Sequence, residues 1–173
     1  MTGTRRRLTG RIQVSLPPDE AFRLFTPRGE QDWAAGWEPR FPAPAPDDTE
    51  PGTVFETDAH GQHTIWLVLD RQHGTRISYA RVTPGGLAGT VTVVVSAADR
   101  HSEVDVTYDL TELTSAAGAS GASGAAGATG AAGAVGHELG EFASTYPAYL
   151  QSWQDAIAAW LRGQPLAHDH HRP

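Results

Sequence analysis

Apolar and polar side chains alternate in several short segments of the chain, and this pattern predicts β-strands. In residues 10–16, Ile12, Val14 and Leu16 share one face, and the residues between them are polar. Further strand-like runs follow at 53–58, 64–70, 75–82, 89–97 and 103–113. Short turns join them, the first at 60–63. Short turns favour antiparallel neighbours in a meander, and one polar face per strand indicates a sheet covered on one side only.

Apolar residues spaced three and four apart predict helices elsewhere. Short helices are expected at 19–25 and at about 28–35. The strongest helical pattern spans 138–162, and its apolar stripe is wide and aromatic. Pro147 either kinks this helix or stands in its first turn, after a cap at Ser144 or Thr145.

The segment 26–41 combines two tryptophans with prolines and glycines. This mixture is too broken for one long helix and too aromatic for an ordinary linker. Trp33 and Trp37 are four residues apart, so they would lie on one face of a short helical turn. We therefore interpret the segment as a wall or lid of an apolar cavity.

The charged residues of this segment and the prolines that follow it have expected structural roles. Glu30 and Asp32 would hold the two tryptophans in place through salt bridges with Arg28 or Arg40. The proline-rich stretch 42–52 is typical of an extended surface loop.

A low-complexity stretch of Ala, Gly, Ser and Thr lies before the long helix, with glycine at every third position from 118 to 136. This period is that of collagen, but the stretch contains no proline. We expect a flexible loop insertion at 114–137 within a single domain of residues 8–163, followed by a disordered tail at 164–173.

Composition excludes several classes of protein. The chain of 173 residues has no cysteine, which rules out disulfides, thiolate metal sites and cysteine nucleophiles. Its net charge is −7, so nucleic acid is not an expected partner. No apolar run follows the basic cluster at 5–7 or approaches the roughly 18 residues of a membrane span, so we expect neither a signal peptide nor a transmembrane helix. The expected location is the cytoplasm.

The sequence resembles the START-like (SRPBCC) superfamily and, within it, bacterial polyketide cyclase/dehydrase-like proteins. The resemblance is carried by residues 12–14, 17–22, 25–37, 66, 77–79 and 149–157. It implies an α+β helix-grip fold, in which an antiparallel curved sheet wraps around a long C-terminal helix, with two short helices after the first strand. Members of this superfamily include lipid and hormone binders, aromatase/cyclases and activators of a chaperone ATPase, so the fold alone does not choose a function.

Aromatic residues of the predicted lid, strands and helix are the candidates for contact with a ligand in such a cavity. They are Trp33, Trp37, Trp66, Tyr79, Tyr108, Tyr146 and Trp153. Each also fits an ordinary core position, and that alternative stays open.

A cyclase-type reaction would need acids, bases or oxyanion donors in the cavity. The weak candidates for catalytic residues are Glu30, Tyr79 and Arg81, of which Tyr79 and Arg81 share a strand face with Ile77. Asp32, His63 and Tyr108 are further candidates, although Tyr108 lies on a valine-rich face that also fits an ordinary core position.

No cofactor or metal is expected. His60 and His63 lie in one predicted turn with His73 nearby, but two histidines without a fixed third ligand are a weak metal signal. The chain also has no phosphate loop, dinucleotide fingerprint or Gly-x-Ser-x-Gly motif.

The sequence therefore favours a protein that binds a hydrophobic small molecule, namely a lipid, a polyketide or an aromatic compound. An enzyme of the polyketide cyclase/aromatase type is the first alternative. A protein-interaction module like the chaperone-ATPase activators is the second. Neither the oligomeric state nor the presence of catalysis follows from the sequence.

Overall fold

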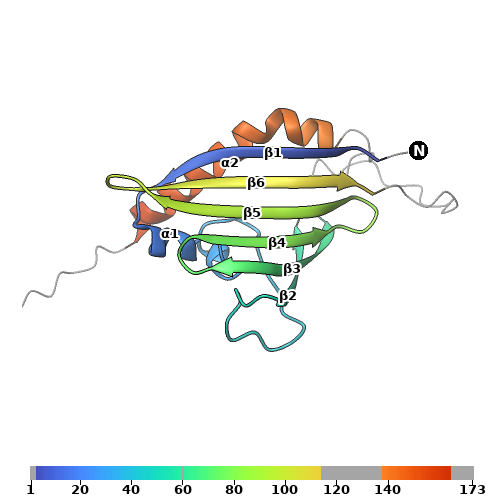
Figure 1. Cartoon of the computed structure of the whole chain (residues 1–173), viewed down its shortest axis with the longest axis horizontal. Helices are drawn as coiled ribbons and strands as arrows, with labels where there is room; N and C mark the ends of the chain where they lie inside the picture. The colour runs from blue at the N-terminus through green and yellow to red at the C-terminus, as the bar shows by residue number, and fades with distance from the viewer. Residues whose placement is uncertain (1–2, 60, 114–137, 165–173) are drawn as a thin grey trace, which may run out of the picture.

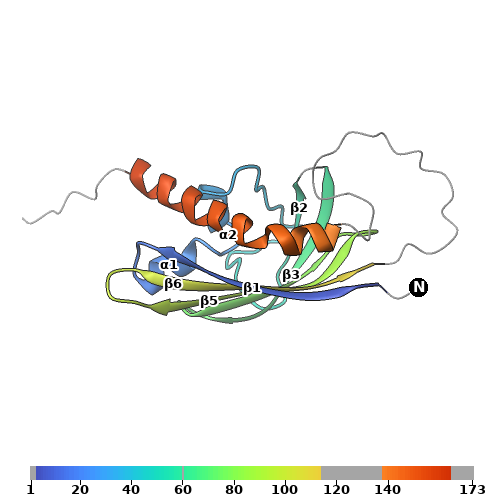
Figure 2. The ribbon, with the colours of Figure 1, turned by 90° about the horizontal axis from the view of Figure 1, so that it is seen from above.

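Six antiparallel strands form one curved sheet, and a long helix lies against one of its faces (Figures 1 and 2). The computed structural model describes residues 3–59, 61–113 and 138–164. The strands are β1 (Arg5–Val14), β2 (Val54–Ala59), β3 (Gln62–Gln72), β4 (Arg76–Val82), β5 (Leu87–Ala97) and β6 (Ser102–Glu112). The helices are α1 (Pro18–Arg23), the 3₁₀ turn η1 (Gly29–Asp32) and α2 (Glu138–Gly163).

The strand order is β1-β6-β5-β4-β3-β2. Strands β2 to β6 form a meander, and β1 pairs with β6 at its edge. Alternation sets the two faces, as β6 shows: Val104, Val106 and Tyr108 are buried, while Glu103 and Asp105 are only partly covered on the opposite face. The α+β helix-grip fold predicted from the sequence is confirmed. The predicted insertion at 114–137 and the tail beyond Gln164 lie outside the described residues.

The first strand is longer than predicted and begins at Arg5 instead of residue 10. Cross-strand ion pairs explain the extension, because the Arg5 guanidinium contacts both carboxylate oxygens of Asp109 at 2.8 Å. Arg11 pairs in the same way with Asp105 on the outer face. Opposite charges across neighbouring strands favour their pairing, so part of the basic cluster belongs to the sheet.

The predicted helix at 28–35 is wrong, because only the single 3₁₀ turn η1 forms there. A Cβ on Gly29 would lie 1.7 Å from the Arg23 carbonyl oxygen, so the backbone is packed closely against the end of α1. The indole N–H groups of Trp33 and Trp37 donate to the carbonyls of Leu24 and Pro27. These bonds fix the two indoles separately instead of on one helical face.

The long helix runs through Pro147 without interruption. The alternative in which it starts at Ser144 or Thr145 is therefore wrong, and both hydroxyls instead donate to the Glu141 carbonyl. No helix in the described ranges combines the length and apolar character that crossing a membrane requires.

Two predicted loops differ from the structure. Residues 62 and 63 belong to β3, so the turn expected at 60–63 is shorter, because Asp58 and Ala59 pair with His63 and Gln62. The stretch 42–52 is folded by bends and turns rather than extended. Asp47 accepts hydrogen bonds from both the N–H and the hydroxyl of Thr49, and it also binds Arg71 on β3.

The outer face of the sheet has two different halves. Over β1 and β6 it carries paired arginines and aspartates. Over β2, β3 and β4 it exposes apolar side chains, namely Val54, Ile65, Leu69 and Val82. Ile65 and Val82 are direct cross-strand partners, so part of this apolar set is contiguous.

Two glycine-to-alanine substitutions test these packing constraints. A Cβ at Gly89 would lie 1.9 Å from the Asp109 carbonyl oxygen, so Gly89→Ala should destabilise the protein by about 1–3 kcal/mol. Gly140 in α2 has open space around the same position, so Gly140→Ala should stabilise it by about 0.5 kcal/mol. Urea unfolding followed by circular dichroism measures both, and equal effects would contradict the assignment of Gly89 to a close backbone contact.

Candidate functional site

Aromatic side chains line the space between the sheet and α2 in two clusters. The lid cluster joins the loop after η1 to β2, β3 and β4, and consists of Trp37, Phe41, Phe55, Trp66 and Tyr79. The helix cluster joins η1 and β6 to α2, and consists of Trp33, Tyr108, Phe142, Tyr146, Tyr149 and Trp153.

The lid cluster is centred on Trp66 of β3. The rings of Phe55 and Trp66 are stacked with centroids 5.7 Å apart, and Trp37 meets Trp66 edge-on at 5.5 Å. The Trp66 indole donates to the Thr57 hydroxyl at 3.0 Å. Because these contacts satisfy the polar atom of Trp66, its ring can offer a ligand only apolar surface.

The helix cluster is centred on Tyr108 of β6. Its ring meets Phe142 at 5.4 Å and Trp153 at 6.5 Å. Its hydroxyl lies 3.5 Å from the hydroxyl of Tyr149, at the outer limit of a hydrogen bond. These two hydroxyls are therefore bound only weakly to each other.

The segment 26–41 connects the two clusters. Trp33 packs edge-on against Trp153 of α2 at 5.4 Å, whereas Trp37 packs against Trp66 of β3. The segment thus extends from the helix to the far half of the sheet.

Several rings face this interior without being fully covered. Tyr149 contacts Phe142 and Tyr108, yet 36% of its surface is exposed. Phe142, Trp153 and Trp37 are only partly buried as well. These rings therefore offer apolar surface that the protein itself does not cover.

A cation stands beside this space. Arg81 follows Tyr79 on the inner face of β4, and its guanidinium carbon lies 5.2 Å from the Trp66 ring centroid. Its Nη2 donates to the Thr83 hydroxyl at 3.1 Å, and Thr83 is in turn bonded to Thr64. Its Nε is buried without a hydrogen-bond partner, and among the described residues no carboxylate forms an ion pair with it.

A carboxyl group stands there too. Burial raises the pKa of Glu30 well above its ordinary value, and the Glu30 charge in turn adds to the raised pKa of the buried Tyr79 hydroxyl. No hydrogen bond or ion pair to the Glu30 carboxyl occurs in the described part of the chain. Residue 30 as a whole keeps some accessible surface. The carboxyl is therefore crowded by protein atoms without being sealed from solvent.

The salt bridges predicted for Glu30 and Asp32 are wrong. Arg28 lies over the ring of Phe41 at 4.3 Å, and Arg40 pairs with Asp58. The indole hydrogen bonds to α1 and to Pro27, rather than acidic side chains, hold the tryptophans.

Four tyrosines face the interior with different polar roles. The hydroxyls of Tyr79 and Tyr146 donate to the carbonyls of Phe25 and Val106 at 2.9 and 2.6 Å. Burial raises the pKa of Tyr108 and of Tyr149, so both keep their protons at neutral pH. The hydroxyls of Tyr108 and Tyr149 instead interact with side chains, namely with each other and, for Tyr149, with Trp153.

All seven residues predicted to contact a ligand belong to one of the two clusters. The structure also brings Glu30 and Arg81 within electrostatic reach of the same tyrosines, Tyr108 and Tyr149. Phe41, Phe55, Phe142 and Tyr149 also belong to these clusters, although they were not predicted as ligand contacts. Phe142 and Tyr149 were visible in the helical stripe, whereas nothing in the sequence distinguished Phe55 from a core residue.

The histidines form no metal centre in the described part of the chain, where no group of three ligating side chains occurs. His63 instead approaches the carboxylates of Asp58 and Glu56 at 2.9 and 3.1 Å on a partly exposed surface. His60 lies outside the described residues.

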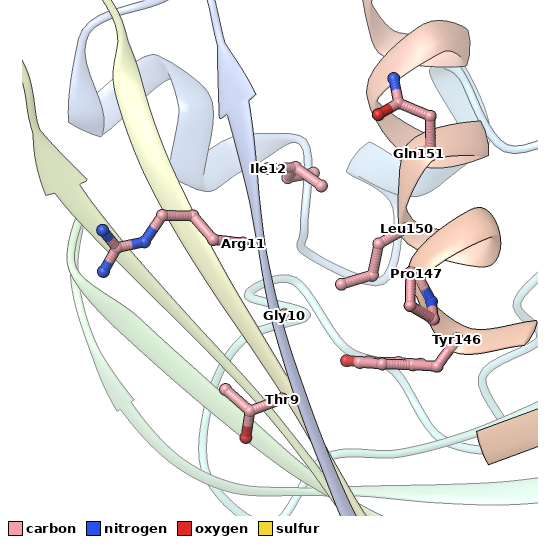
Figure 3. Close-up of a pocket in the computed structure, with 8 residues that line it drawn as sticks. All are labelled: Thr9, Gly10, Arg11, Ile12, Tyr146, Pro147, Leu150 and Gln151. Carbon is pink, nitrogen blue, oxygen red and sulfur yellow. The ribbon is translucent and has the colours of Figure 1, made fainter. Parts of the chain in front are cut away.

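A separate groove lies at the edge of the sheet, between β1 and α2 (Figure 3). Its volume is about 160 Å³, and Tyr146, Leu150 and Ile12 point into it while Arg11 points away. Pockets for small molecules usually measure about 300–1,000 Å³. This groove is therefore smaller than the usual site for a small molecule.

No protein-family model and no curated protein matches the sequence. Three solved structures illustrate the likeness in fold. DynU16, from the dynemicin biosynthetic locus, is 14% identical with a TM-score of 0.57 over 91% of this chain, which spans 47% of DynU16. CalU16 from Micromonospora echinospora is 14% identical, with a TM-score of 0.59 over 93% of this chain and 77% of CalU16.

The third is the Aha1 dimer of Colwellia psychrerythraea, 11% identical with a TM-score of 0.56 over 88% of this chain and 96% of Aha1. At these identities the likeness establishes the fold and not the activity. The chain has the START-like (SRPBCC) fold.

The environment of Glu30 predicts how stability depends on pH. Because the folded-state pKa is raised, the folded protein holds the Glu30 proton more tightly than the unfolded chain does. Glu30 therefore lowers stability as pH rises from its unfolded value of 4.5 through the folded value. Glu30→Gln should be more stable than the parent at pH 8, by about 1 kcal/mol or more, and the gain should vanish below pH 4.

Urea unfolding of the parent and of Glu30→Gln between pH 4 and pH 8 measures the difference in their free energies of unfolding. Contributions from the other titratable groups cancel in this difference. Asp32→Asn is a matched control, since Asp32 is exposed one turn away. A gain that is the same at every pH would contradict the buried position of the Glu30 carboxyl.

Proposed function

We propose that this protein binds a hydrophobic small molecule between the sheet and α2. The observation that carries the proposal is the accessible surface of aromatic rings that face the interior, above all Tyr149. A ligand that covers about 100 Å² of such surface gains roughly 2.5 kcal/mol. The domain predicted at residues 8–163 is the unit that carries this site.

The two clusters suit a flat or elongated apolar ligand. Most of their polar atoms are bonded to the protein itself, so the walls offer ring faces and edges. Contacts between aromatic rings contribute about 0.5–1.5 kcal/mol of stabilisation in addition to that from the apolar area they bury. A lipid, a polyketide or a polycyclic aromatic compound has this character.

Truncation of the exposed ring tests the proposal. The neutral fluorophore N-phenyl-1-naphthylamine should bind the parent protein, with a rise in its fluorescence and energy transfer from tryptophan. Tyr149→Ala should weaken this binding roughly tenfold, equivalent to about 1.4 kcal/mol. Because Tyr149 is partly exposed, the fold should tolerate the change, and circular dichroism checks this.

Leu69→Ala provides the control. Leu69 is 42% exposed, similar to Tyr149, but lies on the outer face of β3. The Leu69→Ala substitution should leave the affinity for the fluorophore unchanged. No binding to the parent protein, together with native mass spectra free of any copurified ligand, would refute the proposed function.

An enzyme of the cyclase/aromatase type is a second candidate. The observation in its favour is that Glu30, Tyr79 and Arg81 surround the same interior, with Glu30 in an environment that favours its protonated form. A protonated carboxyl group can act as a general acid. Glu30→Gln would then keep ligand binding and lose product formation.

A protein-interaction module is the third candidate, and the apolar side chains exposed over β2, β3 and β4 favour it. Exposed apolar patches often mark sites of protein contact. In that case Ile65→Asp, on the outer face, would abolish a complex seen by size-exclusion chromatography without affecting the fluorophore.

A further inference from the structure

We propose that the free edge of β1 binds an extended, acidic peptide segment of another protein as an additional strand. The segment would place an apolar side chain in the groove between β1 and α2, and it would carry carboxylates on the residues to either side. This surface is separate from the interior between the sheet and α2, so the proposal goes beyond the binding of a hydrophobic small molecule.

The strand β1 has an open edge in the part of the chain that the structure describes. It pairs with β6 on one side only, and Figure 1 shows it as the outermost strand of the sheet. The edge is long, because β1 spans 10 residues. An edge of this kind can accept a further strand through hydrogen bonds between backbone groups.

One hydrogen bond shows which backbone groups of β1 point away from β6. The N–H of Gln13 donates to the side chain of Gln154 on α2 at 2.8 Å, so it points outward. Alternate residues of an antiparallel strand direct their N–H and carbonyl groups to opposite edges, so those of Arg7, Thr9 and Arg11 point outward too. Within the described ranges these groups have no hydrogen-bond partner. They are therefore available to an added strand.

The groove beside this edge has a size that suits one side chain. Its volume is about 160 Å³, and Tyr146 and Leu150 of α2 face the strand across it (Figure 3). Gly10 lines the groove from β1 and contributes no side chain to it. Side chains at neighbouring positions of paired strands lie on the same face of a sheet. A residue placed beside Gly10 in an added strand would therefore direct its side chain into this apolar groove.

The charge of β1 indicates the acidic character of the segment. The strand contains four arginines and no acidic residue, although the chain as a whole has a net charge of −7. Arg5 and Arg11 pair with aspartates of β6, yet their side chains remain 72% and 56% exposed. Arg7 is exposed and forms no ion pair within the described residues. All three lie on the outer face, where carboxylates of an added strand would meet them.

The same arginines disfavour a second copy of this chain as the occupant of the edge. A two-fold axis at Thr9, for example, would place Arg7 of one copy opposite Arg11 of the other. Like charges directly opposite each other destabilise strand pairing. A segment with carboxylates at these positions would instead form favourable cross-strand pairs, and this difference favours an acidic peptide over self-association.

Synthetic peptides test the proposal by fluorescence anisotropy. The probe is a fluorescein-labelled peptide of sequence EVELEVE, in which glutamates and apolar residues alternate, and it should bind the parent protein. The peptide KVKLKVK should bind about tenfold more weakly or less, because its charges repel the arginines. The peptide EEVLVEE has the composition of the probe without the alternation. It should bind about fivefold more weakly, because it cannot direct its apolar side chains to one face.

Thr9→Pro removes one outward N–H group from the edge. Proline is tolerated on an edge strand where the N–H faces solvent, so the fold should persist. The affinity for the EVELEVE peptide should fall about tenfold or more, because one backbone hydrogen bond is lost and the ring obstructs the added strand. Val54→Pro on β2, at the opposite edge of the sheet, is the matched control and should leave the affinity unchanged. Circular dichroism checks that both variants are folded.

Amide hydrogen exchange of the parent protein, followed by NMR, provides a measurement that needs no variant. Binding of the EVELEVE peptide should slow exchange about tenfold or more at Arg7, Thr9 and Arg11. Exchange at Leu8 and Gly10 should change little, because their N–H groups already face β6. Attraction of an acidic peptide to the arginines alone would not produce this alternation. The measurement decides the matter if Thr9→Pro does not fold.

Several results would overturn the proposal. They are failure of the EVELEVE peptide to bind, equal binding of the KVKLKVK peptide, and protection of the β1 amides without alternation. A parent protein that is dimeric in analytical ultracentrifugation, and that Thr9→Pro makes monomeric, would overturn it as well, because a second copy would then occupy the edge. None of these results bears on the interior site, which the neutral fluorophore tests separately.

Discussion

The close approach of α2 to β1 is the contact on which the rest of the interior depends. At Gly10 a Cβ would lie only 2.4 Å from a methyl group of Leu150, so the helix rests almost directly on the strand backbone. One turn earlier, Tyr146 donates a hydrogen bond to the Val106 carbonyl of β6 at 2.6 Å. These contacts place α2 over one edge of the sheet (Figure 2). The inner faces of β3 and β4 must then be covered by something else.

The segment 26–41 supplies that cover. Its indoles are tied to the backbone beside α1, and from there one reaches the helix and the other reaches β3. Aromatic rings that meet edge-on hold their neighbours apart while still making favourable contacts. The result is an aromatic interior in which several rings remain partly accessible.

The same packing decides which charged groups in this interior have partners. Arg81 and Glu30 belong to elements far apart in sequence, and neither has a charged partner. A stable fold usually pairs or exposes such groups.

Strict alternation in the strands and the spacing of apolar residues in 138–162 were enough to predict the sheet, the long helix and the face that Tyr79 and Arg81 share with Ile77, because these patterns depend on local periodicity. Tertiary structure decided the rest. Cross-strand ion pairs extended β1 to Arg5, and backbone crowding at Gly29 reduced a predicted helix to a single turn. The sequence determined that an aromatic interior exists, but only the packing of α2 on β1 decided which rings stay accessible. The tertiary packing also left the Glu30 carboxyl without a charged partner, because the distances between side chains remote in sequence depend on how the elements pack.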